Sequence, residues 1–236
     1  MLTTVVLTSV AMTTSPASFA NDEYVTLVAS RLRQVRQRIA AVPTTFAEPR
    51  IVGVTKTFGP EAPEAAWLAG LVDIGENYVE ELEAKRAALE HLPVTWHYLG
   101  ALQSNKISRI VAVADVISGV SRTKEIDRIA ASSRDVLIDI QVDFTRAPER
   151  NGASADEVND LVEYAASKGV RVRGLMTIAP VGEGAGEAFI KTRALADGLG
   201  LAECSMGMTE DLELAIPAGS TELRLGRALF GSRTVQ

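Results

Sequence analysis

The sequence predicts an α/β fold, a single (β/α)₈ TIM-type barrel with one extra helix before it. Short apolar segments alternate with amphipathic stretches from residue 50 onward, and eight of them have the length and composition of strands. Aromatic residues make up only 5% of the chain, so the apolar content is mainly aliphatic, as in a parallel sheet buried on both faces. The length of 236 residues suits one such domain. The alternation also fits a doubly wound sheet, but the count of eight favours the barrel.

The individual elements can be placed along the chain. The leading helix is expected at residues 21–41, where Val28, Leu32, Val35 and Ile39 recur at helical spacing. The predicted strands are the apolar segments that follow, at residues 50–55, 72–75, 95–99, 116–120, 136–142, 170–177, 203–206 and 222–225.

Residues at the ends of the intervening helices support this division. Ser154 and Glu157 have the spacing of a capping box, which predicts that a helix begins there. A last long helix is expected over residues 209–219, with Pro217 disturbing its final turn.

Residues 1–20 are expected to lie outside the domain, which spans residues 21–236. They end in a motif similar to a signal cleavage site, but they lack the positive residues that begin secretory signals. Their apolar run is too short to cross a bilayer. We interpret them as a disordered or wrongly assigned extension, with Met12 as the hypothesised natural start. A mature start at Asn21 would instead support export, and mass spectrometry of the native protein distinguishes the two.

The composition argues against several classes of function. A net charge of −6 without any basic cluster argues against nucleic-acid binding, and no segment predicts a membrane partner. The single cysteine, Cys204, cannot form an internal disulfide and fits a reducing compartment, so we expect a cytoplasmic protein. His91 and His97 are the only histidines and lack ligand spacing, so we expect no metal site.

Lys56 is the first candidate for chemistry, because it ends an apolar strand where a barrel places its active groups. Position alone favours an ordinary solvated lysine. The alternative is a lysine that forms a Schiff base, because a partly desolvated barrel mouth lowers the pKa of an amine and leaves it nucleophilic.

The loops after the last two strands are candidates for binding phosphate. Ser205 ends the seventh strand, while Gly226 and Arg227 follow the eighth. Barrels often bind phosphate at these two loops through backbone N–H groups, and glycine lets the backbone approach an anion closely. Ordinary turn chemistry remains the alternative, and the pattern does not identify the ligand.

Arg224 and Met176 lie within predicted strands. Arg224 alternates with Leu223 and Leu225, so it points away from them, either to the surface or into the barrel as a donor to a ring nitrogen. Met176 and His97 are more simply explained as packing and structural residues, although Met176 could contact a flat ligand.

Six stretches carry a resemblance to a known family: IVGVTK at 51–56, DIGENYVEE at 73–81, WHYLGALQSNK at 96–106, RGLMTI at 173–178, CSMGMTEDLELAI at 204–216 and AGSTELRLGRALFG at 218–231. With them the chain resembles the pyridoxal phosphate homeostasis proteins, which are similar to the barrel domain of alanine racemase.

The resemblance implies a monomeric barrel that binds pyridoxal 5'-phosphate as a Schiff base on Lys56. It implies that the last loops hold the phosphate, through Ser205, Gly226 and Arg227. It also implies residues around the ring: Arg224 at the pyridine nitrogen, Met176 against the ring, and Asn77 and Ser121 in the pocket wall, with Lys106 near the rim. Many members have Thr where this chain has Arg227 and Asn where it has Asp143, which leaves both side-chain contributions open.

The resemblance implies a carrier that contributes to intracellular pyridoxal phosphate homeostasis without clear catalytic turnover, with apo-enzymes as possible recipients. A fold-related racemase or decarboxylase is the alternative, and a phosphate-binding barrel enzyme without a Schiff base is a third possibility. A racemase needs a second acid/base on the opposite ligand face, which alanine racemase takes from a C-terminal domain. We expect no such domain after the eighth strand, although Tyr78 and Tyr98 are conceivable substitutes.

Overall fold

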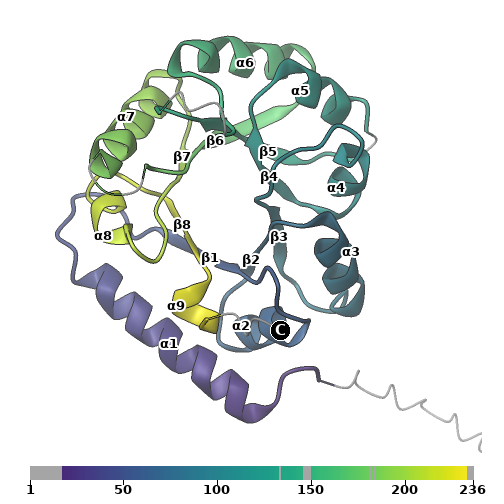
Figure 1. The fold of residues 1–236 in the computed structure, drawn as a ribbon, viewed down its shortest axis with the longest axis vertical. Coiled ribbons are helices and arrows are strands. Elements are labelled where there is room, and N and C mark those ends of the chain that lie inside the picture. The colour runs from purple at the N-terminus through teal and green to yellow at the C-terminus, as the bar shows by residue number, and fades with distance from the viewer. Residues whose placement is uncertain (1–17, 133, 146–149, 181, 183, 233–236) are drawn as a thin grey trace, which may run out of the picture.

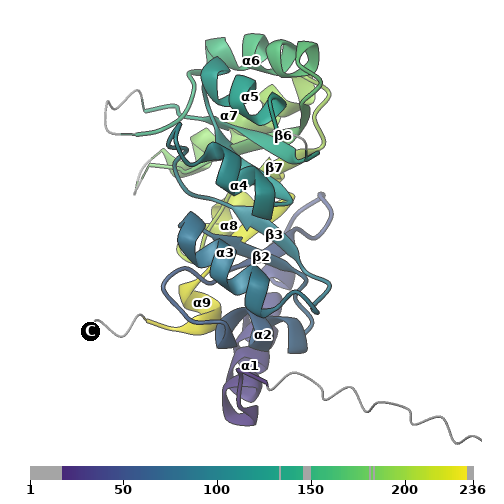
Figure 2. The same ribbon diagram turned by 90° about the vertical axis from the view of Figure 1, so that its right-hand side faces the viewer.

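The computed structural model confirms the predicted fold: a closed barrel of eight parallel strands in chain order, with helices on its outside (Figures 1 and 2). It describes residues 18–132, 134–145, 150–180, 182 and 184–232. The strands are β1 Arg50–Val54, β2 Asp73–Glu76, β3 Thr95–Tyr98, β4 Val116–Val120, β5 Leu137–Val142, β6 Arg171–Thr177, β7 Glu203–Ser205 and β8 Glu222–Leu225. Pairing of β1 with both β2 and β8 closes the barrel and excludes the doubly wound sheet.

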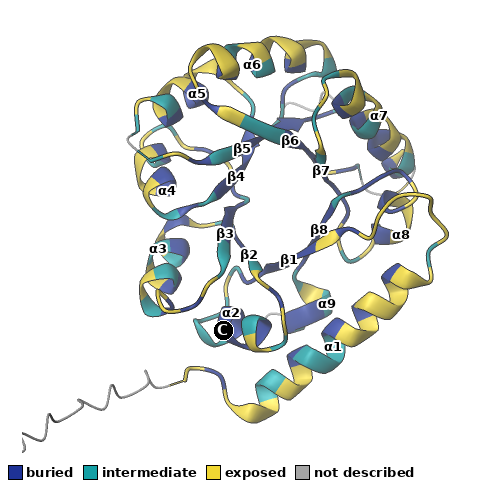
Figure 3. Cartoon of the chain, turned by 180° about the vertical axis from the view of Figure 1, so that it is seen from behind, coloured by how far each residue is buried: buried dark blue, intermediate teal, exposed yellow. Residues whose placement is uncertain are grey.

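Helices follow the strands and cover the barrel with their apolar faces. They are α2 Glu61–Leu68, α3 Val79–Ala88, α4 Ile107–Val113, α5 Thr123–Ala130, α6 Ala155–Ser167, α7 Ala185–Gly198, α8 Leu212–Ala215 and α9 Arg227–Phe230. Burial colouring shows the strands enclosed by these helices, whose outer faces are exposed (Figure 3). The capping box of Ser154 and Glu157 is present at the start of α6.

The extra helix, α1 at Asp22–Ala40, packs across the outside of the barrel against α2 and α9 (Figure 1). Its buried residues are those expected from the spacing: Val28, Leu32, Val35 and Ile39. Just before it, the backbone N–H groups of Phe19 and Ala20 donate to the buried carboxylate of Glu64, at 2.6 and 2.7 Å. The hypothesised start at Met12 lies outside the described residues.

The prediction of a long helix over residues 209–219 is wrong. Only Leu212–Ala215 is helical, and turns flank it on both sides. Pro217 has no N–H to continue the helical ladder. The chain then reverses at Gly219, which has a φ of 88°, and the N–H of Ser220 donates to Ala215. A short α8 leaves residues 206–211 as a loop above the barrel.

An ionic layer fills part of the barrel interior, where branched apolar side chains are usual. Arg173 lies where the pairing of β6 with β5 shifts by one residue. Its guanidinium donates to Asp139 of β5 at 2.8 Å and pairs with Glu222 of β8 at 2.9 Å. Because β5 and β8 are not neighbours, this guanidinium must cross the interior. Within the same layer, His97 bonds to Asp73 at 2.9 Å.

A second buried cluster lies between the barrel wall and α3, directly behind the end of β1. The ammonium of Lys85, which is only 3% exposed, donates to the Thr55 carbonyl at 2.8 Å and to Glu76 Oε1 at 2.6 Å. The Thr55 hydroxyl also donates to Glu76 Oε1, at 2.5 Å. Burial raises the pKa of Glu76 to about 7, although Lys85 and Thr55 act to lower it. The cluster ties the ends of β1 and β2 to one helix.

Within the described ranges, every helix is too short or too polar to cross a lipid bilayer.

The raised pKa of Glu76 predicts a pH dependence of stability. Between about pH 4.5 and about pH 7 the folded protein holds a proton on Glu76 that the unfolded chain has lost. The free energy of unfolding should therefore fall as pH rises through this window, by up to about 3 kcal/mol. Glu76→Gln cannot titrate, so it should lack this slope even though it is less stable overall. Urea unfolding at several pH values measures both slopes.

Glu83→Gln is the matched control, because Glu83 lies on α3, the helix that carries Lys85, but forms an exposed pair with Arg109. It should keep the wild-type slope. Equal slopes in wild type and Glu76→Gln would contradict the assignment.

Candidate functional site

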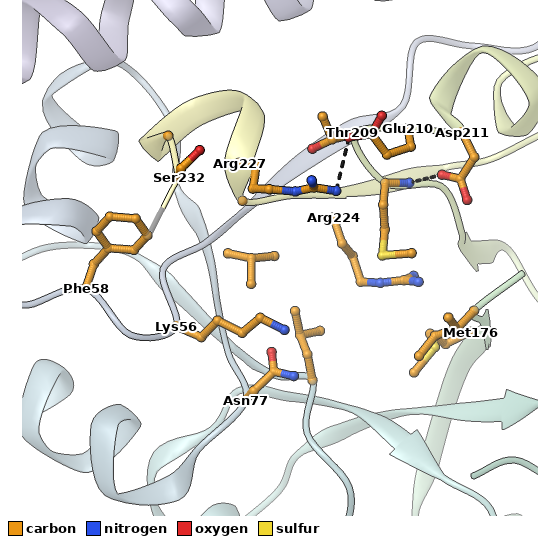
Figure 4. A pocket seen from close by; sticks show the side chains of 16 residues that line it. Lys56, Phe58, Asn77, Met176, Thr209, Glu210, Asp211, Arg224, Arg227 and Ser232 are labelled. Atoms are coloured by element: carbon orange, nitrogen blue, oxygen red, sulfur yellow. Dashed lines mark hydrogen bonds and ion pairs between the residues drawn. The ribbon is translucent and has the colours of Figure 1, made fainter. Parts of the chain in front are cut away.

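A cavity of about 500 Å³ opens at the carboxyl ends of the strands, the end where barrels of this kind place their sites (Figure 4). It brings together most of the residues singled out in the sequence, namely Lys56, Asn77, Met176, Arg224, Gly226 and Arg227. These residues come from the ends of β1, β2, β6 and β8, which are distant in the chain. Closure of the barrel is therefore what assembles the site.

Lys56 lies two residues after the end of β1 and points into the cavity beside Asn77 (Figure 4). The backbone around it is fixed on both sides. The Thr55 N–H donates to Gly75 at 3.0 Å, and the Thr57 N–H donates to the Glu81 carboxylate at 2.8 Å. Thr57 has a φ of 71°, a left-handed conformation that costs a β-branched residue roughly 1–3 kcal/mol. This strained turn directs the lysine inward.

Arg224 takes the inward direction of the two that its sequence position allowed. Only 6% of it is exposed, and it lines the cavity opposite Lys56 (Figure 4). Its guanidinium donates to the carbonyl oxygens of Thr177 at 2.8 Å and Ser205 at 2.5 Å. Burial lowers the pKa of Arg224, while nearby carboxylates, Glu222 first, oppose the change. Arg224 is therefore a cation that two neutral carbonyl acceptors hold rigidly at the cavity wall.

Ser205 lies beneath this wall and does not line the cavity. Its buried hydroxyl donates to Glu222 at 2.7 Å and accepts from Arg224 at 2.8 Å. Burial alone would raise the pKa of Glu222, but interactions with His97, Arg173 and Ser205 lower it, so the carboxylate is ionised. In this arrangement Ser205 links Arg224 to the ionic layer inside the barrel.

The last strand-end loops form the opposite end of the cavity. Gly226 leads into α9, where the N–H groups of Leu229 and Phe230 donate to the Gly226 carbonyl, while those of Arg227 and Ala228 come too early in the helix to have a partner within it. A Cβ on Gly226 would come within 3.2 Å of the Val54 carbonyl, so the site is tight for any other residue. Arg227 extends from the same turn and forms a 3.0 Å ion pair with Glu210. An anion bound here would meet backbone donors and one guanidinium.

Ser121 is not brought to the cavity. Its backbone N–H donates to the Glu125 carboxylate at 2.8 Å, at the start of α5. Lys106 pairs with Glu80 at 3.0 Å, and Asp143 is buried and accepts from the Thr145 hydroxyl at 2.9 Å.

The sequence analysis did not identify several residues that line the cavity. They form apolar walls or the rim near Arg227: Phe58, Leu99, Ile178, Met208, Thr209 and Glu210. Leu99 and Ile178 each follow a strand directly, so the strand-end rule alone could have identified them. Phe58 is held by an aromatic contact with Phe230, with ring centroids 5.8 Å apart. Among the described residues, no three potential ligands form a metal site.

The chain matches the family described as "Alanine racemase, N-terminal domain" over residues 30–234. It is 36% identical over 221 residues to a pyridoxal phosphate homeostasis protein of Pseudomonas aeruginosa, covering 89% of this chain and 95% of that protein. It is 34% identical over 200 residues to the protein of the same name from Aquifex aeolicus, covering 78% and 87%.

Solved structures give the same result. PipY of Synechococcus elongatus without PLP matches with a TM-score of 0.78 at 32% identity, covering 86% of this chain and all (100%) of that one. The form with PLP bound matches with a TM-score of 0.75. Alanine racemase of Bartonella henselae, at 14% identity and a TM-score of 0.69 over 89% of this chain and 61% of that one, shares the fold. The chain therefore belongs to the alanine racemase N-terminal domain family, together with the pyridoxal phosphate homeostasis proteins.

Proposed function

We propose that this protein binds pyridoxal 5'-phosphate as a Schiff base on Lys56 and carries it as part of intracellular pyridoxal phosphate homeostasis. The observation that carries the proposal is the placement of a lysine, an inward arginine and a backbone anion site around one cavity. Relatives with the homeostasis name match nearly their whole length, and PipY has been solved with PLP bound.

The residues present fit this cofactor. A cavity of about 500 Å³ is within the usual range for small-molecule sites. Lys56 would hold the aldehyde, and the Gly226 and Arg227 backbone with the Arg227 side chain would hold the phosphate. Asn77 and Met176 line the space between them, where the ring would lie. When bound, the cofactor supplies an aldehyde for amines and a ring that can act as an electron sink.

Arg224 restrains that chemistry. Its guanidinium keeps its proton and would donate to the pyridine nitrogen, so that nitrogen stays unprotonated and the ring withdraws electrons weakly. The hydrogen bonds to Thr177 and Ser205 prevent the guanidinium from turning away. This arrangement supports cofactor carriage over carbanion chemistry.

Absence of turnover is part of the proposal. Inverting a stereocentre needs acid/base groups on both faces of the ligand. Besides Lys56, the acid/base candidates in the described lining of the cavity are the carboxylates of Glu210 and Asp211. Glu210 pairs with the Arg227 guanidinium and Asp211 accepts from the Met208 N–H, so both carboxylates are engaged at the rim. The racemase and decarboxylase alternative is supported by likeness at 14–16% identity, which shows the fold alone. A monomeric, cytoplasmic protein that delivers the cofactor to apo-enzymes completes the proposal.

Borohydride reduction after incubation with pyridoxal phosphate tests the covalent bond. Peptide mapping should find the reduced adduct on the peptide that contains Lys56, and Lys56→Ala should lose it together with the yellow colour. Lys191→Ala is the control, because Lys191 forms an exposed pair with Glu187 on α7, does not line the cavity and should not affect trapping. Adduct formation at wild-type level in Lys56→Ala would exclude the assignment.

A second prediction concerns the role of Ser205. The family resemblance implies that Ser205 binds the phosphate, whereas its hydroxyl bonds to Glu222 and Arg224, which implies that it orients Arg224. Comparison of pyridoxal phosphate with pyridoxal, which has no phosphate, separates the two roles. If Ser205 orients Arg224, Ser205→Ala should weaken the binding of both ligands by the same factor. Loss of affinity for pyridoxal phosphate alone, measured by absorbance titration, would restore the phosphate role.

Amino-acid turnover provides a third test. Wild-type protein loaded with the cofactor should racemise alanine and decarboxylate lysine no faster than free pyridoxal phosphate does, measured by chiral chromatography and carbon dioxide release. Turnover above that level that Lys56→Ala abolishes would favour the enzyme alternative.

A further inference from the structure

Two hydrogen-bond donors at the rim of the cavity, which are of the kind that bind anions, already have carboxylate partners. Both carboxylates belong to one short loop, residues 206–211. The Arg227 guanidinium pairs with Glu210 at 3.0 Å (Figure 4, dashed line). The Met208 N–H donates to the Asp211 carboxylate at 2.5 Å. Met208, Glu210, Asp211 and Arg227 all line the cavity. The loop therefore places carboxylates where a phosphate would compete for the same donors.

Little holds the ion pair between Arg227 and Glu210 in place, so Arg227 can change partners. The two side chains are 67% and 73% exposed, so neither is held in place by packing. Exposed ion pairs stabilise a folded protein only slightly, because water and salt screen the charges. A phosphate dianion offers a guanidinium two parallel charge-assisted hydrogen bonds, which are stronger than one contact to an exposed carboxylate.

We propose that Glu210 competes with the phosphate of the ligand for Arg227, and thereby sets how tightly the protein holds its cofactor. This inference rests on the proposed function. In the form without ligand, Glu210 neutralises Arg227; when phosphate enters, Arg227 exchanges partners and Glu210 remains nearby as a repelling charge. The competition weakens binding and speeds release, as a carrier that gives up its cofactor requires.

Affinity for phosphate-bearing and phosphate-free ligands tests the competition. Glu210→Gln removes the charge and keeps the size of the side chain, so pyridoxal phosphate should bind about two- to five-fold tighter and dissociate more slowly. Pyridoxal should bind as it does to wild type, and the difference should shrink at high salt. In an Arg227→Met background the substitution should lose most of its effect.

Glu213→Gln is the matched control. Glu213 forms a comparable exposed pair with Arg38 at 2.7 Å, links α8 to α1 and does not line the cavity. It should bind both ligands with wild-type affinity. If Glu210→Gln and Glu213→Gln have the same affinity for pyridoxal phosphate, or if Glu210→Gln tightens pyridoxal equally, the competition does not exist.

Inorganic phosphate separates this inference from the Schiff base. In a Lys56→Ala background, phosphorus NMR titration should show tighter phosphate binding with Glu210→Gln than without it. That result would support the competition even if borohydride trapping at Lys56 failed. Unchanged phosphate binding would overturn the competition even if trapping succeeded.

Discussion

The buried ammonium of Lys85 fixes the part of the chain on which the whole site depends. By donating to the Thr55 carbonyl and to Glu76, it joins the ends of β1 and β2 to α3 from behind the barrel wall. Lys56 is the next residue, so its direction is set by a neighbour whose backbone is bonded on both edges. A buried cation held this way is stable only while its partners stay in place, because an unpaired buried charge is costly.

Buried charges inside the barrel also position the opposite wall of the cavity. Glu222 stays ionised because Arg173, His97 and Ser205 surround it, and Ser205 in turn orients Arg224. Filling the interior with ions instead of branched aliphatic residues costs desolvation, but it gives the guanidinium a fixed direction. Lys56 and Arg224 thus face the cavity from opposite walls, and each is positioned by side chains that lie outside it.

The sequence predicted the fold closely because the alternation of eight apolar strands with helices leaves few other arrangements. Strand ends located Lys56 and Gly226 at one rim, since parallel strands in a barrel end together, and the family resemblance added Asn77 and Met176. The length of α8 could not be predicted in the same way, because its residues have helical composition and a proline near the end decides the outcome.

The hydrogen-bond and ion-pair partners of the side chains were harder to predict from the sequence than the fold. Ser205 follows the strand-end rule, yet its hydroxyl bonds to Glu222 and Arg224, because alternation along a three-residue strand does not tell how deep a side chain lies. The pairing of Arg227 with Glu210 depends on how the loop before α8 folds back, which no local pattern encodes.

A crystal structure of the protein grown with pyridoxal phosphate tests the central claim most directly. We expect continuous electron density from Lys56 Nζ to the aldehyde carbon, with the ring nitrogen facing Arg224 and the phosphate at Gly226 and Arg227. A cofactor seated elsewhere, or a Lys56 side chain without a covalent bond to it, would contradict the account.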